Sequence, residues 1–195
     1  VWSNAGYDLL NGKNVDNNHR WRLMAGYYRK LIHRANERLT AGLTSMVWHY
    51  DKDLSGYTLG NGGYYSPQQY YSLSVPLSYA WRTPDWSFLV EGTVSWSYAK
   101  TNNSPLYPLK NRVPLGQPGL NDETTGGSSS GVGYTTRAIA ERRLTNHMVL
   151  GAGLDIQQAR DYTPSRAMLY LRYTVQPWQG NLPLPPVPLV PYADF

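Results

Sequence analysis

Residues 71–98 read YSLSVPLSYAWRTPDWSFLVEGTVSWSY, and this stretch alternates between large apolar and small polar side chains with a period of two. In its first half the odd positions carry Tyr, Leu, Val, Leu, Tyr and Trp, while the even positions are mostly Ser. In its second half most of the apolar and aromatic residues fall on even positions. Alternation of this kind predicts two β-strands, each with one apolar and one mostly polar face.

The segment between these two expected strands is Arg82-Thr83-Pro84-Asp85, a short turn with Pro at a favourable position. Both strands have the length at which a tilted strand crosses a bilayer. Aromatic residues stand at both ends of each apolar face, as the two interfacial girdles of an outer-membrane barrel require. A soluble sandwich also alternates, but it has little reason to place rings at both ends of one face. The pattern therefore favours an antiparallel transmembrane β-barrel.

Further segments carry the same alternation with more irregularities, which makes about eight strands in the chain. These segments lie at positions 1–10, 21–28, 39–48, 132–143, 148–157 and 166–175. Long connections are expected at 11–18, 51–69 and 101–130, a smaller one at 161–164, and short turns at 33–36, 82–85 and 145–146. Outer-membrane barrels have short periplasmic turns and long extracellular loops, so this order predicts a periplasmic C-terminus.

The composition agrees with a membrane interface. The chain has 17 Tyr and 7 Trp but only 2 Phe, and Tyr and Trp are the aromatics that settle where apolar tails meet water. The absence of Cys excludes a disulfide framework and a Cys-based metal site. The net charge of +5 is spread along the chain without a nucleic-acid-binding motif, so no nucleic-acid partner is expected.

The start of the chain lacks the features of a signal peptide. Val1-Trp2-Ser3-Asn4 carries neither a charged region nor an apolar stretch of that kind. Nor does any segment approach the ~18 consecutive apolar residues of a transmembrane helix. We therefore expect the sequence to begin after processing or, more simply, within a longer protein.

Eight strands can close a small barrel or form part of a larger one. A closed eight-stranded barrel fills its interior with side chains, and the inward residues here include many Ser, Gly, Ala and Thr. Side chains this small favour half of a larger, water-filled barrel. Inward Arg, Glu, Tyr and Trp would also suit a salt-bridged plug, so a complete small outer-membrane barrel stays an alternative.

The tail differs in kind from the strand region at 1–176. From Pro177 onward the chain is rich in proline, and proline cannot donate the hydrogen bonds of a sheet. We expect residues 177–195 to form an extended polyproline-like tail. It is either a disordered linker or an arm folded against the barrel mouth or into the lumen. Tyr192 and Phe195 are the candidates for a gating role in the second case.

Three stretches resemble the C-terminal region of the bacterial cellulose synthase operon protein C family, the outer-membrane subunit of cellulose secretion. They are GGYYSPQ at 62–68, DIQQARDY at 155–162 followed by Pro164-Ser165, and WQG at 178–180 with PLVPYADF at 188–195. Together they span most of the chain in the right order. The final Phe195 stands where we would expect Trp in close relatives, and it keeps an aromatic end.

The resemblance implies that this chain is the last eight strands and the tail of a barrel of about sixteen strands. Periplasmic tetratricopeptide repeats of the same full-length protein would precede that barrel. A single cellulose chain, a β-1,4-glucan, would pass through it across the outer membrane of a Gram-negative bacterium. The implied partners are cellulose, outer-membrane lipid, these repeats and other cellulose-secretion subunits.

Glucan export needs flat rings against which sugar faces slide, and polar groups that bind sugar hydroxyls. The inward residues supply both kinds, and the candidates for lining the lumen are Trp48, Tyr50, Tyr70, Tyr170, Gln157, Arg137 and Arg172. Taken one by one, these residues are more simply read as hydrating the wall. The arginines are more simply read as pairing with Glu91, Glu141 and Asp155 on neighbouring strands.

Enzyme activity is not expected of this chain. Its four histidines lack metal-ligand spacing, and Glu91 and Glu141 offer no sign of the cleft that a glycosidase pair needs. We therefore expect neither a catalytic residue nor a metal or cofactor. The main alternative from another class is a secreted carbohydrate-binding β-sandwich, which would display its rings in a concave patch rather than in two bands.

Overall fold

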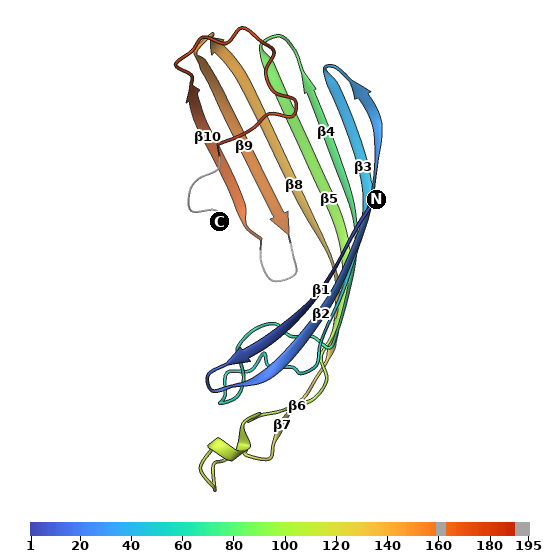
Figure 1. Ribbon diagram of the computed structural model, residues 1–195, viewed down its shortest axis with the longest axis vertical. Coiled ribbons are helices and arrows are strands. Elements are labelled where there is room, and N and C mark those ends of the chain that lie inside the picture. Colours follow the sequence, from blue (N-terminus) through green and yellow to red (C-terminus); the bar gives the residue numbers. More distant parts are fainter. Residues whose placement is uncertain (159–162, 190–195) are drawn as a thin grey trace. The chain divides into compact units, whose positions relative to one another are not determined.

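The computed structural model describes residues 1–158 and 163–189, and antiparallel strands make up most of it (Figure 1). Eight strands form the sheet, in the order β1-β2-β3-β4-β5-β8-β9-β10. Their bounds are β1 Trp2–Gly12, β2 Val15–Arg34, β3 Glu37–Tyr50, β4 Gln69–Arg82, β5 Trp86–Lys100, β8 Ser128–Thr145, β9 Met148–Gln158 and β10 Ser165–Tyr173. The all-β prediction is confirmed, and each of the eight expected strands is present.

The sheet neighbours are also neighbours along the chain, apart from a small excursion between β5 and β8. There β6 (Ser104–Pro105) pairs with β7 (Glu123–Thr124), and a short 3-10 helix η1 (Lys110–Arg112) lies between them. Antiparallel neighbours joined by turns or loops are the arrangement that hairpin connections produce. No helix in the described part of the chain is long and apolar enough to cross a membrane.

The chain divides into two compact units, which are described separately below. The first unit holds residues 1–26, 44–73 and 96–131, and the second holds residues 27–43, 74–95 and 132–195. Five strands, β2, β3, β4, β5 and β8, contribute one part to each unit. The expected boundary between strands and tail at residue 177 stays a prediction.

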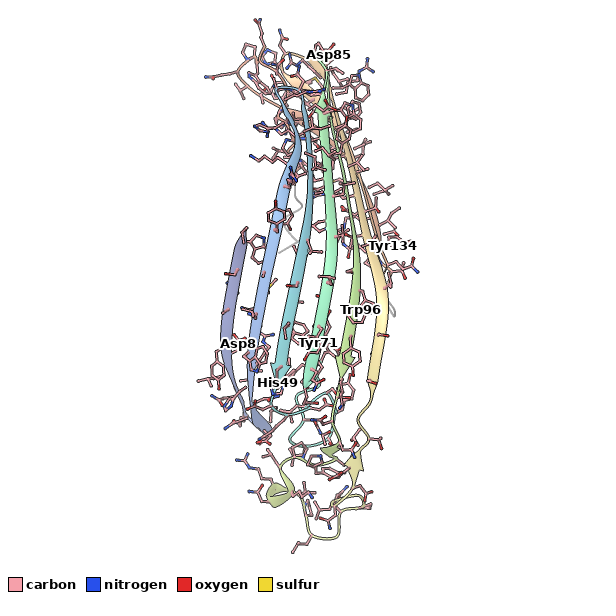
Figure 2. All side chains as sticks on the ribbon, turned by 90° about the vertical axis from the view of Figure 1, so that its right-hand side faces the viewer. Asp8, His49, Tyr71, Asp85, Trp96 and Tyr134 are labelled. Atoms are coloured by element: carbon pink, nitrogen blue, oxygen red, sulfur yellow. The ribbon has the colours of Figure 1, made fainter. Side chains whose placement is uncertain are left out.

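The alternation in the sequence reappears as alternating exposure of the side chains. On β4, Tyr71, Leu73, Val75 and Leu77 are between 43% and 55% exposed, whereas the residues between them are partly covered. On β5 the exposed residues include Val94 and Trp96, and Figure 2 shows Trp96 near Tyr71 of the neighbouring strand. Both strands therefore have an exposed apolar face.

Aromatic residues cluster near the ends of the strands on this exposed face. In the second unit, the ring of Trp81 stacks on Tyr79 and on Phe88, with centroids 5.0 and 4.7 Å apart, and Phe88 stacks on Trp86 at 5.3 Å. In the first unit, Tyr71 stacks on Tyr98 at 6.3 Å. Packed rings beside an apolar face are the arrangement expected of an interfacial girdle.

One expected connection is wrong. The polar stretch 11–18 was predicted to be a long loop, but β1 continues to Gly12 and β2 begins at Val15, its direct partner. Only two residues form the turn, and Asn14 has a left-handed backbone with φ 64°. Asn tolerates that conformation better than most residues, so a tight turn is possible here. The polar residues that follow belong to β2.

Candidate functional site

A row of aromatic rings lies on the covered face of the first unit. Alternation along β3 turns Trp48 and Tyr50 to the same face, and Tyr70 comes from β4 beside them. The ring centroids of Trp48 and Tyr70 are 4.6 Å apart, and those of Trp48 and Tyr50 are 6.5 Å apart. Tyr64, from the loop between β3 and β4, extends the row, with its centroid 5.8 Å from that of Tyr50.

Polar contacts fix the position of this aromatic row. Arg20 donates to the hydroxyl of Tyr50 at 3.1 Å and to the carboxylate of Asp8 at 2.8 Å. The buried Asn18 donates to the Tyr64 hydroxyl at 3.0 Å. Burial raises the pKa of the Tyr64 phenol, while the hydrogen bond from Asn18 acts in the opposite direction. These bonds hold two of the rings in place.

Trp48 retains an unused hydrogen-bond donor. Its indole Nε1 is buried and has no hydrogen-bond partner among residues 1–158 and 163–189. A buried donor without a partner is costly, so a ligand oxygen that reaches it gains a favourable interaction. The row therefore combines flat ring surfaces with one available donor.

The second unit contains a buried charged cluster, in which Glu141 of β8 meets Tyr170 and Arg172 of β10. Glu141 is fully buried, and it accepts hydrogen bonds from the Tyr170 hydroxyl at 2.6 Å and from Arg172 at 2.9 Å. The Tyr170 ring lies over Gly151, its direct partner on β9. A Cβ at Gly151 would come within 2.1 Å of that ring, so glycine provides the space that the tyrosine occupies.

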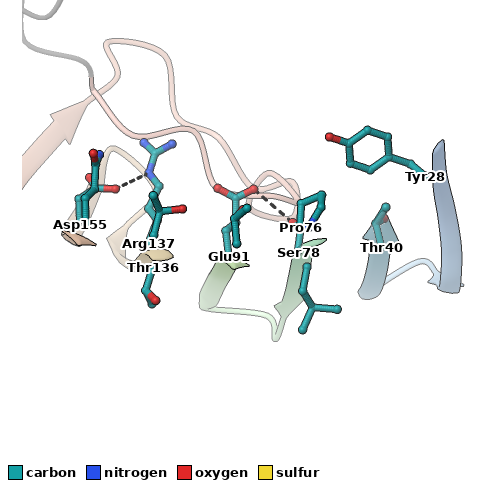
Figure 3. A pocket seen from close by; sticks show the side chains of 12 residues that line it. Tyr28, Thr40, Pro76, Ser78, Glu91, Thr136, Arg137 and Asp155 are labelled. Atoms are coloured by element: carbon teal, nitrogen blue, oxygen red, sulfur yellow. Dashed lines mark hydrogen bonds and ion pairs between the residues drawn. The ribbon is translucent and has the colours of Figure 1, made fainter. Parts of the chain in front are cut away.

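A cavity of about 350 Å³ in the second unit is lined by polar groups of several kinds. Figure 3 shows Arg137 beside its β9 partner Asp155, with 3.6 Å between Nε and the carboxylate, and Glu91 beside Ser78 at 3.2 Å. Gln157 lines the same cavity, as do the ring of Tyr28 and the hydroxyl of Thr40. A guanidinium, carboxylates, an amide and hydroxyls in one cavity suit a ligand that carries many hydroxyl groups.

The described part of the tail packs on the second unit. Leu182 is fully buried, and Leu184 forms one hydrophobic cluster with Ala80, Leu89 and Ile139. Figure 1 shows this segment crossing the ends of the strands between β10 and β5. The tail residues 177–189 are therefore folded onto the sheet.

Side chains of the sheet hold the tail by its backbone carbonyl groups. Arg82 donates to the carbonyl of Leu182 at 2.8 Å, and Ser87 donates to that of Pro183 at 2.6 Å. Arg172 reaches the carbonyl of Val187 at 2.9 Å, and Arg143 that of Gly180. Carbonyls in a proline-rich segment have few backbone donors near them, so these side chains supply the missing partners.

Comparison with known proteins assigns the chain to a family. The family model described as "Cellulose synthase operon protein C C-terminus" matches residues 1–176. The chain belongs to this family. The cellulose synthase operon protein C of Salmonella typhimurium is 54% identical over the whole chain, that of Escherichia coli strain K12 is 50% identical, and that of Pseudomonas fluorescens is 31% identical. The chain spans 17%, 17% and 15% of these three relatives.

The structure brings several candidate residues of this cellulose synthase operon protein C region together. Trp48, Tyr50 and Tyr70 form the aromatic row of the first unit. Tyr170 and Arg172 meet at Glu141, while Arg137 and Gln157 line the cavity of about 350 Å³. Tyr192 and Phe195 lie outside the described residues, so their gating role stays a prediction.

Sequence reasoning missed two members of these sites. Tyr64 lies in a loop, where alternation gives no direction, and its place depends on a hydrogen bond from Asn18, 46 positions away. Tyr28 lines the cavity of about 350 Å³, yet it is not among the candidates. The signal for Tyr28 was present, since it shares the alternation of its strand.

Proposed function

We propose that this chain forms part of the wall of an outer-membrane β-barrel through which cellulose leaves the bacterial cell. The observation that carries the proposal is the alternation in exposure on β4, where apolar side chains are exposed on one face and small, mostly polar ones lie on the other. Lipid tails are the natural neighbours of the first face, and a water-filled lumen is the natural neighbour of the second. Membership of the cellulose synthase operon protein C family supports cellulose as the cargo.

The polar faces of the two units suit a neutral glucan. Sugar rings have flat C–H faces that pack on aromatic rings, as the row containing Trp48 and Tyr70 provides. Their hydroxyls exchange hydrogen bonds with groups such as those around Arg137 and Glu91. These contacts are individually weak and similar to one another, which lets a polymer slide instead of stopping at one position.

The proposed pore performs no catalysis. A glycosidase requires two available carboxyl groups beside a bound sugar. Both oxygens of Glu141 are occupied, one by Tyr170 and one by Arg172, and the residue is fully buried. Glu91 therefore lacks a carboxyl partner in Glu141, and Asp155, the other carboxylate of its cavity, faces Arg137 at 3.6 Å. We propose a passive translocation channel.

The chain would be one part of a longer barrel protein. In the strand order β1 and β10 stand at the two ends, so each offers an edge with which further strands can pair. The full-length relatives are long enough for more strands and for periplasmic repeats, since this chain spans only 15–17% of them. In this arrangement the turns from β2 to β3, from β4 to β5 and from β8 to β9 lie in the periplasm together with the C-terminus, and the two-residue turn from β1 to β2 lies at the other end with the long loops. Other cellulose-secretion subunits deliver the polymer on the periplasmic side.

Two neighbouring cysteine substitutions test the orientation of β4. The chain contains no native Cys, so Ser74→Cys and Val75→Cys each introduce one thiol, on opposite faces of the same strand. In outer-membrane vesicles containing a cysteine-free full-length protein, we expect a charged maleimide to label Ser74→Cys several times faster than Val75→Cys. A lipid-soluble maleimide should keep that order, because maleimides react with the thiolate and a thiol among lipid tails stays protonated. If each reagent labelled Ser74→Cys and Val75→Cys at the same rate, the result would show that the apolar face does not meet lipid.

Replacing Trp48 tests the aromatic row. A stacking contact contributes about 1 kcal/mol, so Trp48→Ala should slow glucan export about fivefold. Trp96→Ala is the matched control, because Trp96 belongs to the same unit but is exposed on the apolar face. The measurement is secreted cellulose per amount of assembled protein in the outer membrane. Export at the wild-type rate by Trp48→Ala, or an equal loss by Trp96→Ala, would exclude a ring contact with the polymer.

A further inference from the structure

A second cavity of the second unit has a strongly one-sided charge. It measures about 230 Å³, and Pro185 of the tail forms part of its lining. Lys30 and His33 line it from β2, and Arg38 lines it from β3. No carboxylate contributes to the lining. The cavity therefore holds two permanent positive charges, from Lys30 and Arg38.

The side chains of Lys30, His33 and Arg38 have no hydrogen bond or ion pair within the described residues. Arg34, the residue that follows His33, pairs instead with Glu37 at 3.0 Å. The carboxylates near the cavity are already engaged. Glu37 accepts from Arg34 and from the hydroxyl of Tyr79, and Glu91 accepts from Ser78.

The cavity also offers hydroxyl donors. Thr40 and Ser78 line it, on the same face as Arg38 and Lys30 by the alternation of their strands. The planar guanidinium of arginine forms two parallel hydrogen bonds to an oxyanion, and the lysine ammonium adds a point charge. Partial enclosure by the tail strengthens both interactions relative to open water.

We propose that this cavity binds a phosphate-type oxyanion, either free phosphate or a phosphomonoester. The charge exceeds what a neutral glucan needs, so the site goes beyond the proposed export function. Arg38 and Lys30 hold the anion, and the hydroxyl of Thr40 donates to a remaining oxygen. Pro185 places the tail beside the bound anion, which links the tail to the occupancy of the site.

Phosphorus NMR of the full-length protein in maltoside detergent tests the site. The probes are inorganic phosphate and glycerol 3-phosphate, and the readout is broadening of the phosphorus line on titration with protein. We expect the Lys30→Gln/Arg38→Gln double variant to bind about tenfold more weakly than wild type. If glycerol 3-phosphate binds more tightly than inorganic phosphate, a phosphomonoester is the better ligand. If the two probes bind equally, the site recognises the phosphate group alone.

Two controls make the result specific to this cavity. Lys110→Gln/Arg112→Gln removes the same two residue types from η1 in the first unit, and it should bind phosphate like wild type. Arg38→Lys keeps the charge, so it should bind far better than the double variant even if that variant folds poorly. The proposal is overturned if wild-type protein does not broaden the phosphate line, or if both double variants lose binding equally. Because no polymer is involved, neither result depends on whether the protein exports cellulose.

Discussion

Replacing Glu141 by Ala is expected to destabilise the folded protein by about 3–5 kcal/mol, because it leaves a buried ion pair with one member. Glu141 is fully buried and accepts hydrogen bonds from Tyr170 at 2.6 Å and Arg172 at 2.9 Å. Without it, the carbonyl of Val187 is the one partner that the Arg172 guanidinium keeps among residues 1–158 and 163–189, and the Tyr170 hydroxyl loses its bond to Glu141. The change also weakens the hold of the sheet on the tail.

Urea unfolding of the full-length protein in detergent measures this effect. Glu91→Ala is the matched control in the same unit, because Glu91 is only partly covered and, within the described part of the chain, has a single hydrogen bond, from Ser78 at 3.2 Å. Its loss should cost about 0.5–1.5 kcal/mol. Glu141→Gln should lie between the two variants, since the amide oxygen still accepts from Tyr170 but leaves Arg172 without its counter-charge. Equal stability of Glu141→Ala and Glu91→Ala would contradict the buried cluster.

The strands and their faces were predictable because alternation is a local property. Each residue of β4 faces opposite to its neighbours whatever the rest of the chain does, so the sequence alone indicated that Leu73 and Val75 share one face. The error at 11–18 has the opposite origin. Asn18 is 1% exposed because it bonds to Lys52 and Tyr64, which lie 34 and 46 positions away. A polar run with such distant partners looks like a loop in the sequence.

For the candidate sites, the sequence predicted the face on which each residue lies but not the contacts between strands. Alternation placed Trp48 and Tyr50 on the inward face, yet it could not show which rings come into contact across strands. For the tail, the prolines excluded a strand but were compatible with both a linker and a folded arm. Leu184 packs with Ala80, Leu89 and Ile139, which lie on three separate strands. Composition alone gives no information about such contacts.

The exposed apolar face leads to the second large expected effect. Val94 is 57% exposed near the middle of β5, where a strand that spans a bilayer is deepest in the hydrocarbon. An arginine at that depth on the lipid face of a barrel costs about 2–4 kcal/mol. Val94→Arg should therefore sharply reduce the amount of full-length protein assembled in the outer membrane, and it should lower the stability in lipid vesicles by a similar free energy.

Thr93→Arg is the matched control, because Thr93 is the preceding residue on β5 and lines the cavity of about 350 Å³ on the opposite face. A charged side chain there remains in water if that face lines a lumen, so assembly and stability should stay close to wild type. The sheet itself would fold in either case. If Val94→Arg assembles as well as Thr93→Arg, the apolar face does not meet lipid tails. The protein would then carry its cellulose-related role on a surface rather than through a pore.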